Sequence, residues 1–558
     1  MNYRKRLFQG LFFIFLPAFF LSCRNEKKPV EKDIVKKPEQ LQEHLSDDLK
    51  KILQYAHSNK GNMNDSVHLN YLRLDSSFYE AKNYESVWSE NGKWLPLGDS
   101  LFNFIEHAGE YGLFPQDYHY KPLSFIHRAL ADSFARKNAI LWTRADLLFT
   151  DAFFSLVKDL KQGRLKYDSV TLRTDTVLND TFFSKNLNEA LQSGGVVSTL
   201  HALEPKYAGY DSLKEAVKNF LSTAKFKPFT YLVYPYKDSV SFFKSLQKRL
   251  YEAAFISSDS AKMDTSAIAG VIKKYQKEKG LKTTGKVSET MVDMLNNTDL
   301  EKFKRIAVTL DRYKLLPDTL PHTYVWVNLP SFNLQVMNSD TVALESKIIV
   351  GAPKTRTPLL TSEITNFITL PQWTVPMSII FKEMLPKIQK NMDYLKKENL
   401  MVVDNNDNVV DPVKVNWAKL NKNHFPYQLK QQQGDNNSLG VIKFNFRNKY
   451  SVYLHDTNVR WMFGKSFRAL SHGCVRVKEW EKLSNFLVRN DTVRYKPDTL
   501  RAWIKRQEKH TVSGFQRVPV FIRYFGASAK DGHVRFYEDI YGEDKFLREK
   551  YFADKTVN

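Results

Sequence analysis

Residues 471–477 read S-H-G-C-V-R-V, and residues 455–457, at the end of a strand-like run upstream, read H-D-T. Cys474 is one of only two cysteines among the 558 residues of the chain. A cysteine beside a flexible glycine, with a histidine at a neighbouring strand end, is the arrangement of a thiol nucleophile. The imidazole can take the thiol proton, and the resulting charged pair would stabilise the thiolate. We therefore predict that Cys474 is a nucleophile and that His455 is its general base.

The residues around the thiol supply further candidates for the site. His472 and Arg476 add positive charge, although each could instead only orient the loop or pair with a carboxylate. The backbone N–H groups of Gly473 and of the cysteine are candidates to hold an oxyanion. Asp456 could orient His455 through its side chain, or it could contribute only its backbone.

The spacing of apolar residues predicts the local structure of this segment. Residues 442–446 alternate between apolar and polar, a short turn follows, and a second strand is expected over 450–454. This pattern is typical of a β-hairpin, here one that leads into His455. Helical spacing resumes at Trp480, so we expect Cys474 to lie in a tight connection from a strand to a helix.

The rest of the C-terminal half is predicted to be a β-rich domain over residues 320–545 with an insert. Residues 377–439 first show helical spacing and then become polar, which indicates a helix-and-loop insert in this domain. The β-rich runs that begin the domain lie at 324–327, 332–336, 347–351 and 367–370.

The N-terminal half has a mostly helical pattern. Residues 49–235 repeat apolar side chains at helical spacing, which predicts a helical scaffold. Residues 238–298 resemble the small three-helix peptidoglycan-binding module, with Gln276 and Gly285 at motif positions. A helical hairpin without a ligand is the alternative. Residues 24–48 are rich in charge and lack an apolar period, which predicts a disordered tether.

The N-terminus resembles a bacterial lipoprotein signal. A basic start at residues 4–6 precedes a short apolar run, which ends at 20–23 in F-L-S-C. We therefore expect residues 1–23 to be a signal peptide that ends in a lipidated Cys23, and the mature protein to be exported and anchored on the periplasmic side. An ordinary cleaved signal is the alternative. Arg24 in place of Asp favours the outer membrane over the inner membrane.

Composition narrows the classes of partner. The chain carries 83 Lys and Arg against 61 Asp and Glu, a formal charge of +22. Such a basic surface suits nucleic acid, an anionic membrane or an acidic polymer. The presence of only two cysteines excludes a disulfide scaffold and a cysteine-rich metal site. Expected export and the lack of a basic aromatic motif argue against a nucleic-acid partner.

The motifs H-D-T and S-H-G-C-V-R-V resemble the active-site signature of the L,D-transpeptidases, the YkuD-type cell-wall cross-linking enzymes. Further segments are similar to the large multidomain branch of that family, whose members carry a helical scaffold, a peptidoglycan-binding module and a capped catalytic domain. These segments are residues 311–313, 327–330, 350–351, 356–358, 373–376, 439–440, 453–457, 519–520, 524–525 and 539–542.

The resemblance implies a multidomain α+β protein. Its parts would be the helical scaffold, the three-helix module and a mixed β-rich catalytic domain capped by the insert. The resemblance further implies that Cys474 attacks the third residue of a donor stem tetrapeptide, with release of D-Ala. The acyl group would then pass from the thioester to a side-chain amine of a neighbouring stem, which gives a 3→3 cross-link.

The family motif also places Tyr453, Trp373 and Ser471 near the substrate cleft, although aromatic residues in β domains are mostly core. No metal or organic cofactor is implied, and carbapenems are expected to acylate the thiolate. Peptidoglycan stem peptides would be the partners, and their carboxylates would suit the basic surface. Two alternatives remain. One is a Cys–His cell-wall hydrolase or carboxypeptidase, and the other is a non-catalytic lipoprotein that only binds the wall.

Overall fold

The protein is described here by a computed structural model. The residues that it describes are 32–63, 67–166, 177–259, 264–339, 341–496 and 498–557. Cys23 and the signal peptide predicted over 1–23 lie outside these ranges. Among the described residues, no helix combines the length and the hydropathy needed to cross a bilayer.

The chain forms two compact units. The first comprises the residues up to 95 together with residues 122–151, and the second comprises residues 96–121 and residues 152 onward. The catalytic-domain motifs, the insert and the three-helix module all belong to the second unit, so every candidate site residue described below lies in one unit.

The first unit is helical and contains a buried carboxylate. Asp146 accepts hydrogen bonds from the hydroxyls of Tyr79 and Ser86 at 2.6 and 2.7 Å, and from the Trp88 N–H at 3.1 Å. A buried polar group needs such partners, so these bonds fix the loop before β1 against a helix. The elements are α1 (Leu41–Ser58), α2 (Leu72–Ala81), β1 (Ser89–Glu90), β2 (Lys93–Trp94), most of α4 (Tyr120–Ala129) and the first part of α5 (Ala139–Lys161).

Helix α1 corrects the predicted boundary of the N-terminal tether. Leu41, Leu45 and Leu49 recur every four residues and are all buried, so they form the packed face of the helix. The tether predicted over 24–48 is therefore wrong for residues 41–48. Charged residues lie between these leucines, and one of them, Asp48, is itself buried, so the apolar period was hidden in the sequence.

The second unit contains further helices, of which α8 and α12 pack against the C-terminal hairpin and α12 against the C-terminal helix. They include α3 (Pro96–Glu106), α6 (Asp180–Ser193), α7 (Val196–Ala202), α8 (Ala208–Thr223), α12 (Asp299–Lys314) and α18 (Glu543–Tyr551), with the hairpin β16 (Ala527–Lys530) and β17 (His533–Phe536). Phe114, Phe303 and Phe552 lie in one apolar core that α8 and α12 share. Asp544, fully buried near the start of α18, pairs with Arg312 at 2.5 Å. The C-terminal hairpin and helix are thus tied to the helical layer.

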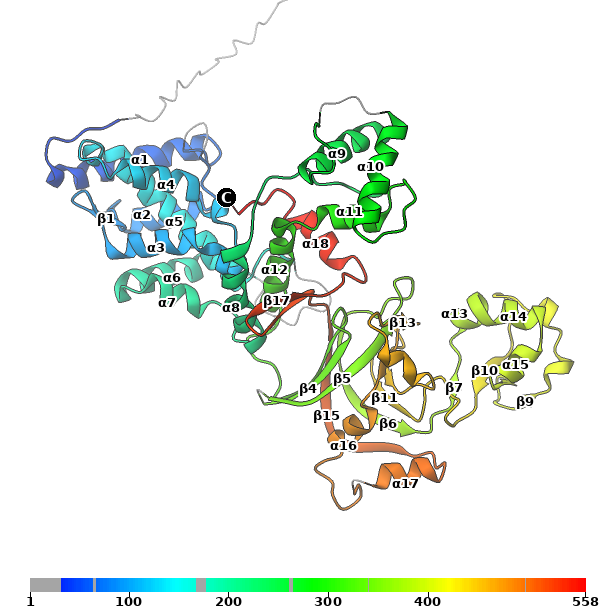
Figure 1. The fold of residues 1–558 in the computed structure, drawn as a ribbon. Coiled ribbons are helices and arrows are strands. Elements are labelled where there is room, and N and C mark those ends of the chain that lie inside the picture. The colour runs from blue at the N-terminus through cyan, green and yellow to red at the C-terminus, as the bar shows by residue number, and fades with distance from the viewer. Residues whose placement is uncertain are drawn as a thin grey trace, which may run out of the picture. The chain divides into compact units, whose positions relative to one another are not determined.

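Residues 238–298 fold as three helices, drawn in green in Figure 1. They are α9 (Ser239–Glu252), α10 (Thr265–Glu278) and α11 (Glu289–Asn296), and they share their own apolar core. The side chain of Gln276 accepts hydrogen bonds from the N–H groups of Thr284 and Gly285 and donates to the Lys286 carbonyl. The motif residues at these positions therefore shape a turn, and glycan binding by the module stays a prediction.

A nine-stranded sheet forms the core of the C-terminal domain. The strands lie in the order β13-β5-β14-β12-β11-β6-β15-β3-β4, and β4 also pairs with β5, so the sheet closes on itself. Buried side chains from every second position fill its interior. The bounds are β3 (Thr323–Asn328), β4 (Asn333–Asn338), β5 (Thr341–Gly351), β6 (Leu360–Thr369), β11 (Ile442–Phe446), β12 (Leu454–His455), β13 (Ala469–Ser471), β14 (Val475–Val477) and β15 (Thr511–Arg523).

The connection that carries Cys474 differs from the prediction. The thiol lies in a turn between β13 and β14, and helix α16 (Trp480–Leu487) begins only later. Val475 and Val477 are buried while Arg476 between them is not, so this segment alternates as a strand does. The expected strand-to-helix connection is therefore wrong, and a second strand follows the thiol directly. Helix α17 (Thr499–Lys505) leads into β15.

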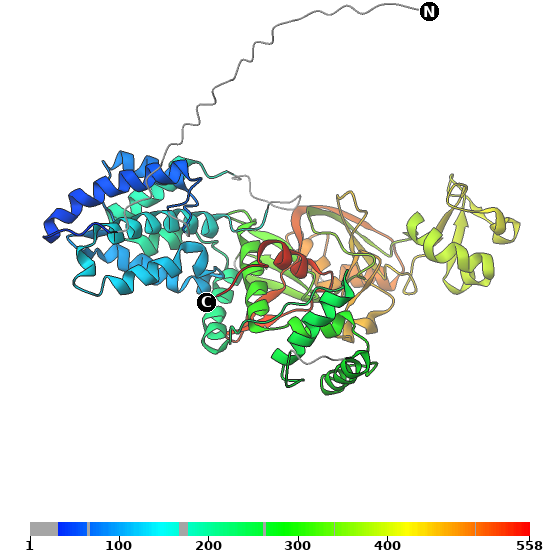
Figure 2. The same cartoon turned by 90° about the horizontal axis from the view of Figure 1, so that it is seen from above.

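The insert has a core and a small sheet of its own, and Figure 2 shows it in yellow-green as a separate lobe. The four strands lie in the order β7-β10-β8-β9. Short helices lie between β7 and β8, and the polar stretch after residue 404 contains strand as well as loop. The elements are β7 (Trp373–Thr374), α13 (Met377–Ile379), a π-helical turn (Ile380–Met384), α14 (Leu385–Lys390), α15 (Asp393–Lys397), β8 (Leu400–Val403), β9 (Val409–Val410) and β10 (Gln428–Gln431).

Candidate active site

Strand register places the predicted site residues on one face of the closed sheet. His455 on β12 is the partner of Lys443 on β11 and of Arg476 on β14. Partners in neighbouring strands point to the same side, so these three side chains form a row across three strands. Leu454 and Val475, one position earlier on β12 and β14, are buried on the core face. Cys474 and Tyr453 therefore share the face of the row.

The thiol of Cys474 is half-buried and is surrounded by polar groups of the β12 segment. Its Sγ lies 3.9 Å from the carbonyl oxygen of Ser451, and the neighbouring Tyr453 lowers the pKa of the thiol. Burial raises the pKa of Cys474, and the hydrogen bonds from Tyr453 and the charges of Lys443 and Arg476 offset only part of this effect.

His455 is 4% exposed and is held by backbone groups. Carbonyl oxygens of Asp456 and Leu439 accept from the ring, and its buried Nδ1 has no hydrogen-bond partner among the described residues. Burial and the nearby charge of Arg476 lower the pKa of His455 to about 3. The ring is therefore a neutral imidazole near neutral pH, with Nδ1 able to accept a proton.

These pKa directions correct the expected charged pair. With the pKa of Cys474 raised and that of His455 lowered, the resting pair is a thiol beside a neutral imidazole. Burial disfavours the charged form of both groups, and this effect cannot be read from the sequence.

Asp456 uses its carboxylate for hydrogen bonds with groups other than the ring of His455. Its fully buried carboxylate accepts from the Val441 N–H at 3.1 Å and from Nε of Arg460 at 3.0 Å. Only its backbone carbonyl reaches the ring of His455. A methyl group on Gly440, which has φ +61°, would lie 2.2 Å from this carboxylate. Asp456 therefore anchors the start of β11, and through it the position of Lys443.

Ser471 and Gly473 both take part in hydrogen bonds within the turn. The Ser471 hydroxyl, 3% exposed, donates to the Cys474 carbonyl at 2.6 Å and accepts from the Gly473 N–H at 3.2 Å. Thr357 donates to the Gly473 carbonyl at 2.8 Å, and Gly473 has φ +120°, which suits glycine alone. Ser471 thus holds the turn through two hydrogen bonds, and its contact with a substrate stays a prediction. The Gly473 N–H is already used.

The remaining oxyanion candidate is the backbone N–H of Cys474, for which the described part of the chain provides no hydrogen-bond partner. An N–H on the attacking residue itself is well placed for this role, because the oxyanion forms next to the sulfur.

Two contacts link the insert to the site. His472 is exposed, and its Nε2 lies 2.8 Å from Oε1 of Glu383, a residue of the π-helical turn. Trp373 on β7 influences the side chain of Tyr453, whose pKa it lowers in part, and Tyr453 in turn interacts with the thiol. The insert therefore reaches the active-site turn at His472. It also reaches Tyr453, which together with Cys474, Lys443, His455 and Arg476 forms what we call the thiol cluster.

Lys443 is the site residue that sequence analysis missed. Its ammonium lies 4.1 Å from the ring centroid of Tyr453. Burial lowers the pKa of Lys443, and the neighbouring Cys474 offsets only part of this effect. The signal was present in the sequence: Lys443 is a polar position between buried Ile442 and Phe444, in a hairpin that leads to the predicted base. Sequence alone does not show that this position is the partner of His455.

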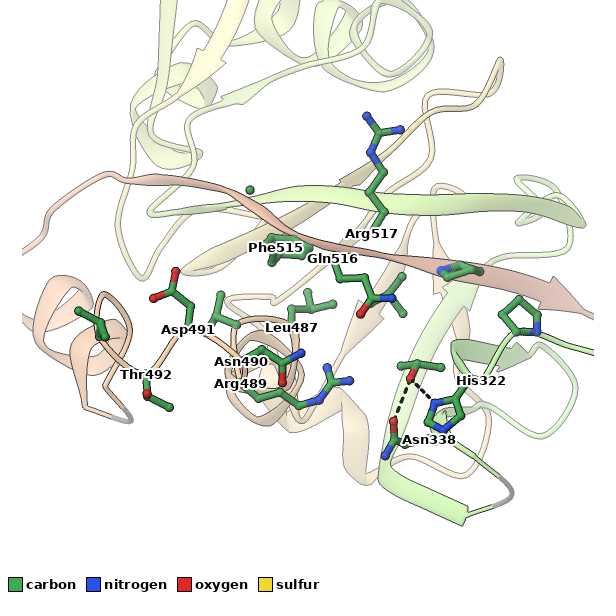
Figure 3. Close-up of a pocket in the computed structure, with 17 residues that line it drawn as sticks. His322, Asn338, Leu487, Arg489, Asn490, Asp491, Thr492, Phe515, Gln516 and Arg517 are labelled. Carbon is green, nitrogen blue, oxygen red and sulfur yellow. Dashed lines mark hydrogen bonds between the residues drawn. The ribbon is translucent and has the colours of Figure 1, made fainter.

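A separate cavity of about 860 Å³ lies at another part of the domain, shown in Figure 3. His322, Asn338, Arg489, Asp491 and Gln516 are among its lining residues, and none of the thiol cluster lines it. Across the described ranges, no group of three His, Cys, Asp or Glu side chains could hold a metal ion.

Comparisons with known proteins agree with this site. Residues 322–494 match the L,D-transpeptidase catalytic domain, called YkuD, and residues 75–217 match a scaffold domain. The part of the chain over 322–494 is therefore an L,D-transpeptidase catalytic domain, and the chain carries a scaffold domain before it. The predicted multidomain α+β organisation, with a helical N-terminal region and a mixed β-sheet catalytic domain, is confirmed at this level.

Two individual proteins are also similar. A Haemophilus influenzae protein, provisionally named an L,D-transpeptidase, is 34% identical over 250 residues, which cover 43% of this chain and 48% of the relative. The chain thus matches about half the length of that relative. A solved structure of an Ldtfm–avibactam carbamoyl enzyme matches 56% of this chain and 96% of its own at 13% identity, with a TM-score of 0.16. With a TM-score this low, the two folds are not shown to be similar.

The neutral thiol–imidazole pair predicts how alkylation of Cys474 depends on pH. The rate of reaction with iodoacetamide should rise through one inflection above the ordinary thiol pKa of about 8.5, because burial raises the pKa of Cys474. No inflection should occur near about 6.5, the ordinary histidine value, because His455 is already neutral there. Peptide mass spectrometry measures the label on Cys474. A plateau of fast alkylation that extends into acid would reveal a thiolate–imidazolium pair and contradict this account.

Proposed function

We propose that the protein is a peptidoglycan L,D-transpeptidase in which Cys474 is the nucleophile. The observation that carries the proposal is that four reactive or charged side chains share one face of the sheet in an L,D-transpeptidase catalytic domain. A half-buried thiol lies there with the neutral imidazole of His455 and the cations of Lys443 and Arg476. The substrate and the reaction steps are those that the resemblance of the motif implies, and here they are assigned to these side chains.

In the first half-reaction, His455 takes the proton of the thiol while the sulfur attacks a carbonyl carbon. That carbon belongs to the third residue of a donor stem tetrapeptide, and the Cys474 N–H donates to the developing oxyanion. The carbon–nitrogen bond to the terminal D-Ala then breaks. The leaving amine takes the proton from His455, and the acyl group remains on the sulfur as a thioester.

In the second half-reaction, a side-chain amine on the third residue of a neighbouring stem attacks the thioester. His455 accepts a proton from this amine, the carbon–sulfur bond breaks, and the proton returns to the sulfur. The product is a 3→3 cross-link with the free thiol restored. The same sulfur would open the strained ring of a carbapenem and hold the inhibitor as an acyl adduct.

Product analysis tests the reaction. The purified protein is incubated with disaccharide tetrapeptide, and the muropeptides are identified by mass spectrometry. We expect released D-Ala and a 3→3 dimer with wild type. With Cys474→Ala, we expect neither product and a folding free energy within about 1 kcal/mol of wild type, because the side chain is small. Cross-linking by Cys474→Ala would contradict the assignment, and tripeptide alone from wild type would indicate a Cys–His hydrolase.

The insert over 377–439 is proposed to cap the site during transfer. Water competes with the amine for the thioester, so transfer requires a positioned amine and partial exclusion of water. The contacts Glu383–His472 and Trp373–Tyr453 support this role, because they join the insert to the turn and to the thiol cluster.

Removal of one contact tests the cap. Glu383→Ala should raise the ratio of hydrolysed tripeptide to 3→3 dimer by about two- to fivefold, the range that an exposed ion pair can contribute. Lys382→Ala is the matched control, because Lys382 is the exposed neighbour of Glu383 and has no part in the contact. An unchanged ratio together with reduced total turnover would show that the insert does not control access of water.

The location of the protein is proposed from the sequence. A lipid on Cys23 would hold the exported enzyme on the periplasmic side, with the outer membrane favoured. The three-helix module would bring the catalytic domain to peptidoglycan. The charge of +22 supports an acidic polymer as the partner, since stem peptides carry free carboxylates.

A further inference from the structure

We propose that Lys443 forms a subsite for the free C-terminal carboxylate of the peptide that Cys474 cleaves. The inference rests on the proposed function and extends it, because it names the group that selects a donor with a free C-terminus. The ligand is a peptide carboxylate that lies one residue beyond the scissile carbonyl. Because consecutive Cα atoms are ~3.8 Å apart, this carboxylate would lie close to the carbonyl that the thiol attacks.

Two observations fix the position of Lys443 next to the thiol. The first is the register, because Lys443 is the partner of His455 on the adjacent strand. The second is the ring of Tyr453, over which the ammonium lies at 4.1 Å from the centroid. The side chain of the same tyrosine also acts on the thiol, because it lowers the pKa of Cys474. Lys443 and Cys474 are therefore both neighbours of Tyr453.

The charges of this face require an anion. Among the described residues, no carboxylate lies within ion-pair distance of Lys443 or Arg476, and both side chains are partly buried. The Nε of Arg476 is buried without a partner. Burying an unpaired charge is costly unless an opposite charge arrives. The resting thiol is neutral and His455 is neutral, so the face holds two cations and no anion until a substrate binds.

The two cations have different surroundings, and this assigns the carboxylate to Lys443. Arg476 follows Cys474 by two residues, and its charge lowers the pKa of the imidazole more than the charge of Lys443 does. Lys443 lies on the opposite side of His455 in the row, above Tyr453. An ammonium on a flexible stem can follow a carboxylate that moves away with the leaving residue, whereas a guanidinium is more rigid.

The test compares two donors that differ only in this charge. Initial rates of release of the terminal residue are measured with a tetrapeptide donor that ends in a carboxylate and with the same donor as the C-terminal amide. Wild type, Lys443→Met, Lys443→Arg and Lys449→Met are compared. Lys449 is a matched control because it is exposed, lies in the same hairpin and also sits over a tyrosine, at 5.3 Å from the Tyr450 centroid.

We expect Lys443→Met to lower kcat/KM for the carboxylate donor by about ten- to a hundredfold, mainly through KM, as for a lost hydrogen bond to a charged group. The amide donor should lose much less, because it loses only the effect of the Lys443 charge on the thiol. Lys443→Arg should recover part of the loss, and Lys449→Met should behave as wild type. An equal loss on both donors would overturn the subsite, since Lys443 would then act on the thiol itself.

A second measurement needs no turnover and separates the subsite from the proposed reaction. N-acetyl-D-alanine should slow alkylation of Cys474 by neutral iodoacetamide in wild type and not in Lys443→Met, while N-acetyl-D-alaninamide should protect neither. If protection is seen but no peptide is cleaved, the subsite stands and the proposed function fails. If N-acetyl-D-alanine protects both proteins equally, or neither, the subsite is wrong.

Discussion

The pairing of β11, β12 and β14 is the constraint on which the site depends. It places Lys443, His455 and Arg476 in one row, although they come from three separate segments of the sequence. A slip of one residue in either pairing would turn a whole strand over and bury its charges in the core. Leu454 and Val475 resist such a slip because they are fully buried on the other face. The apolar core of the domain therefore sets the geometry of its polar face.

Burial sets the protonation of the site as well as its geometry. It raises the pKa of the thiol and lowers that of the imidazole, so both groups rest without charge. A neutral thiol is less open to adventitious oxidation and alkylation than a thiolate. The cations beside it then favour negative charge where it develops, on the sulfur, the oxyanion or a bound carboxylate. Activation is thus coupled to the arrival of a substrate.

Much of this organisation could be predicted from local sequence. The motif around Cys474, the alternation in 442–446 and the change from helical to strand spacing all depend on near neighbours in the chain. Three features could not be predicted this way. The role of Lys443 depends on strand register, the neutral pair depends on burial, and the inward position of Ser471 depends on a turn that its hydroxyl itself closes.

The central claim is that Cys474 carries a covalent acyl intermediate, and intact-protein mass spectrometry after rapid quenching with a tetrapeptide donor tests it most directly. The account predicts an adduct equal to the donor less its terminal D-Ala, located by peptide mapping on Cys474 and released by hydroxylamine as a thioester. Product formation without any adduct, or an adduct on another residue, would contradict the account.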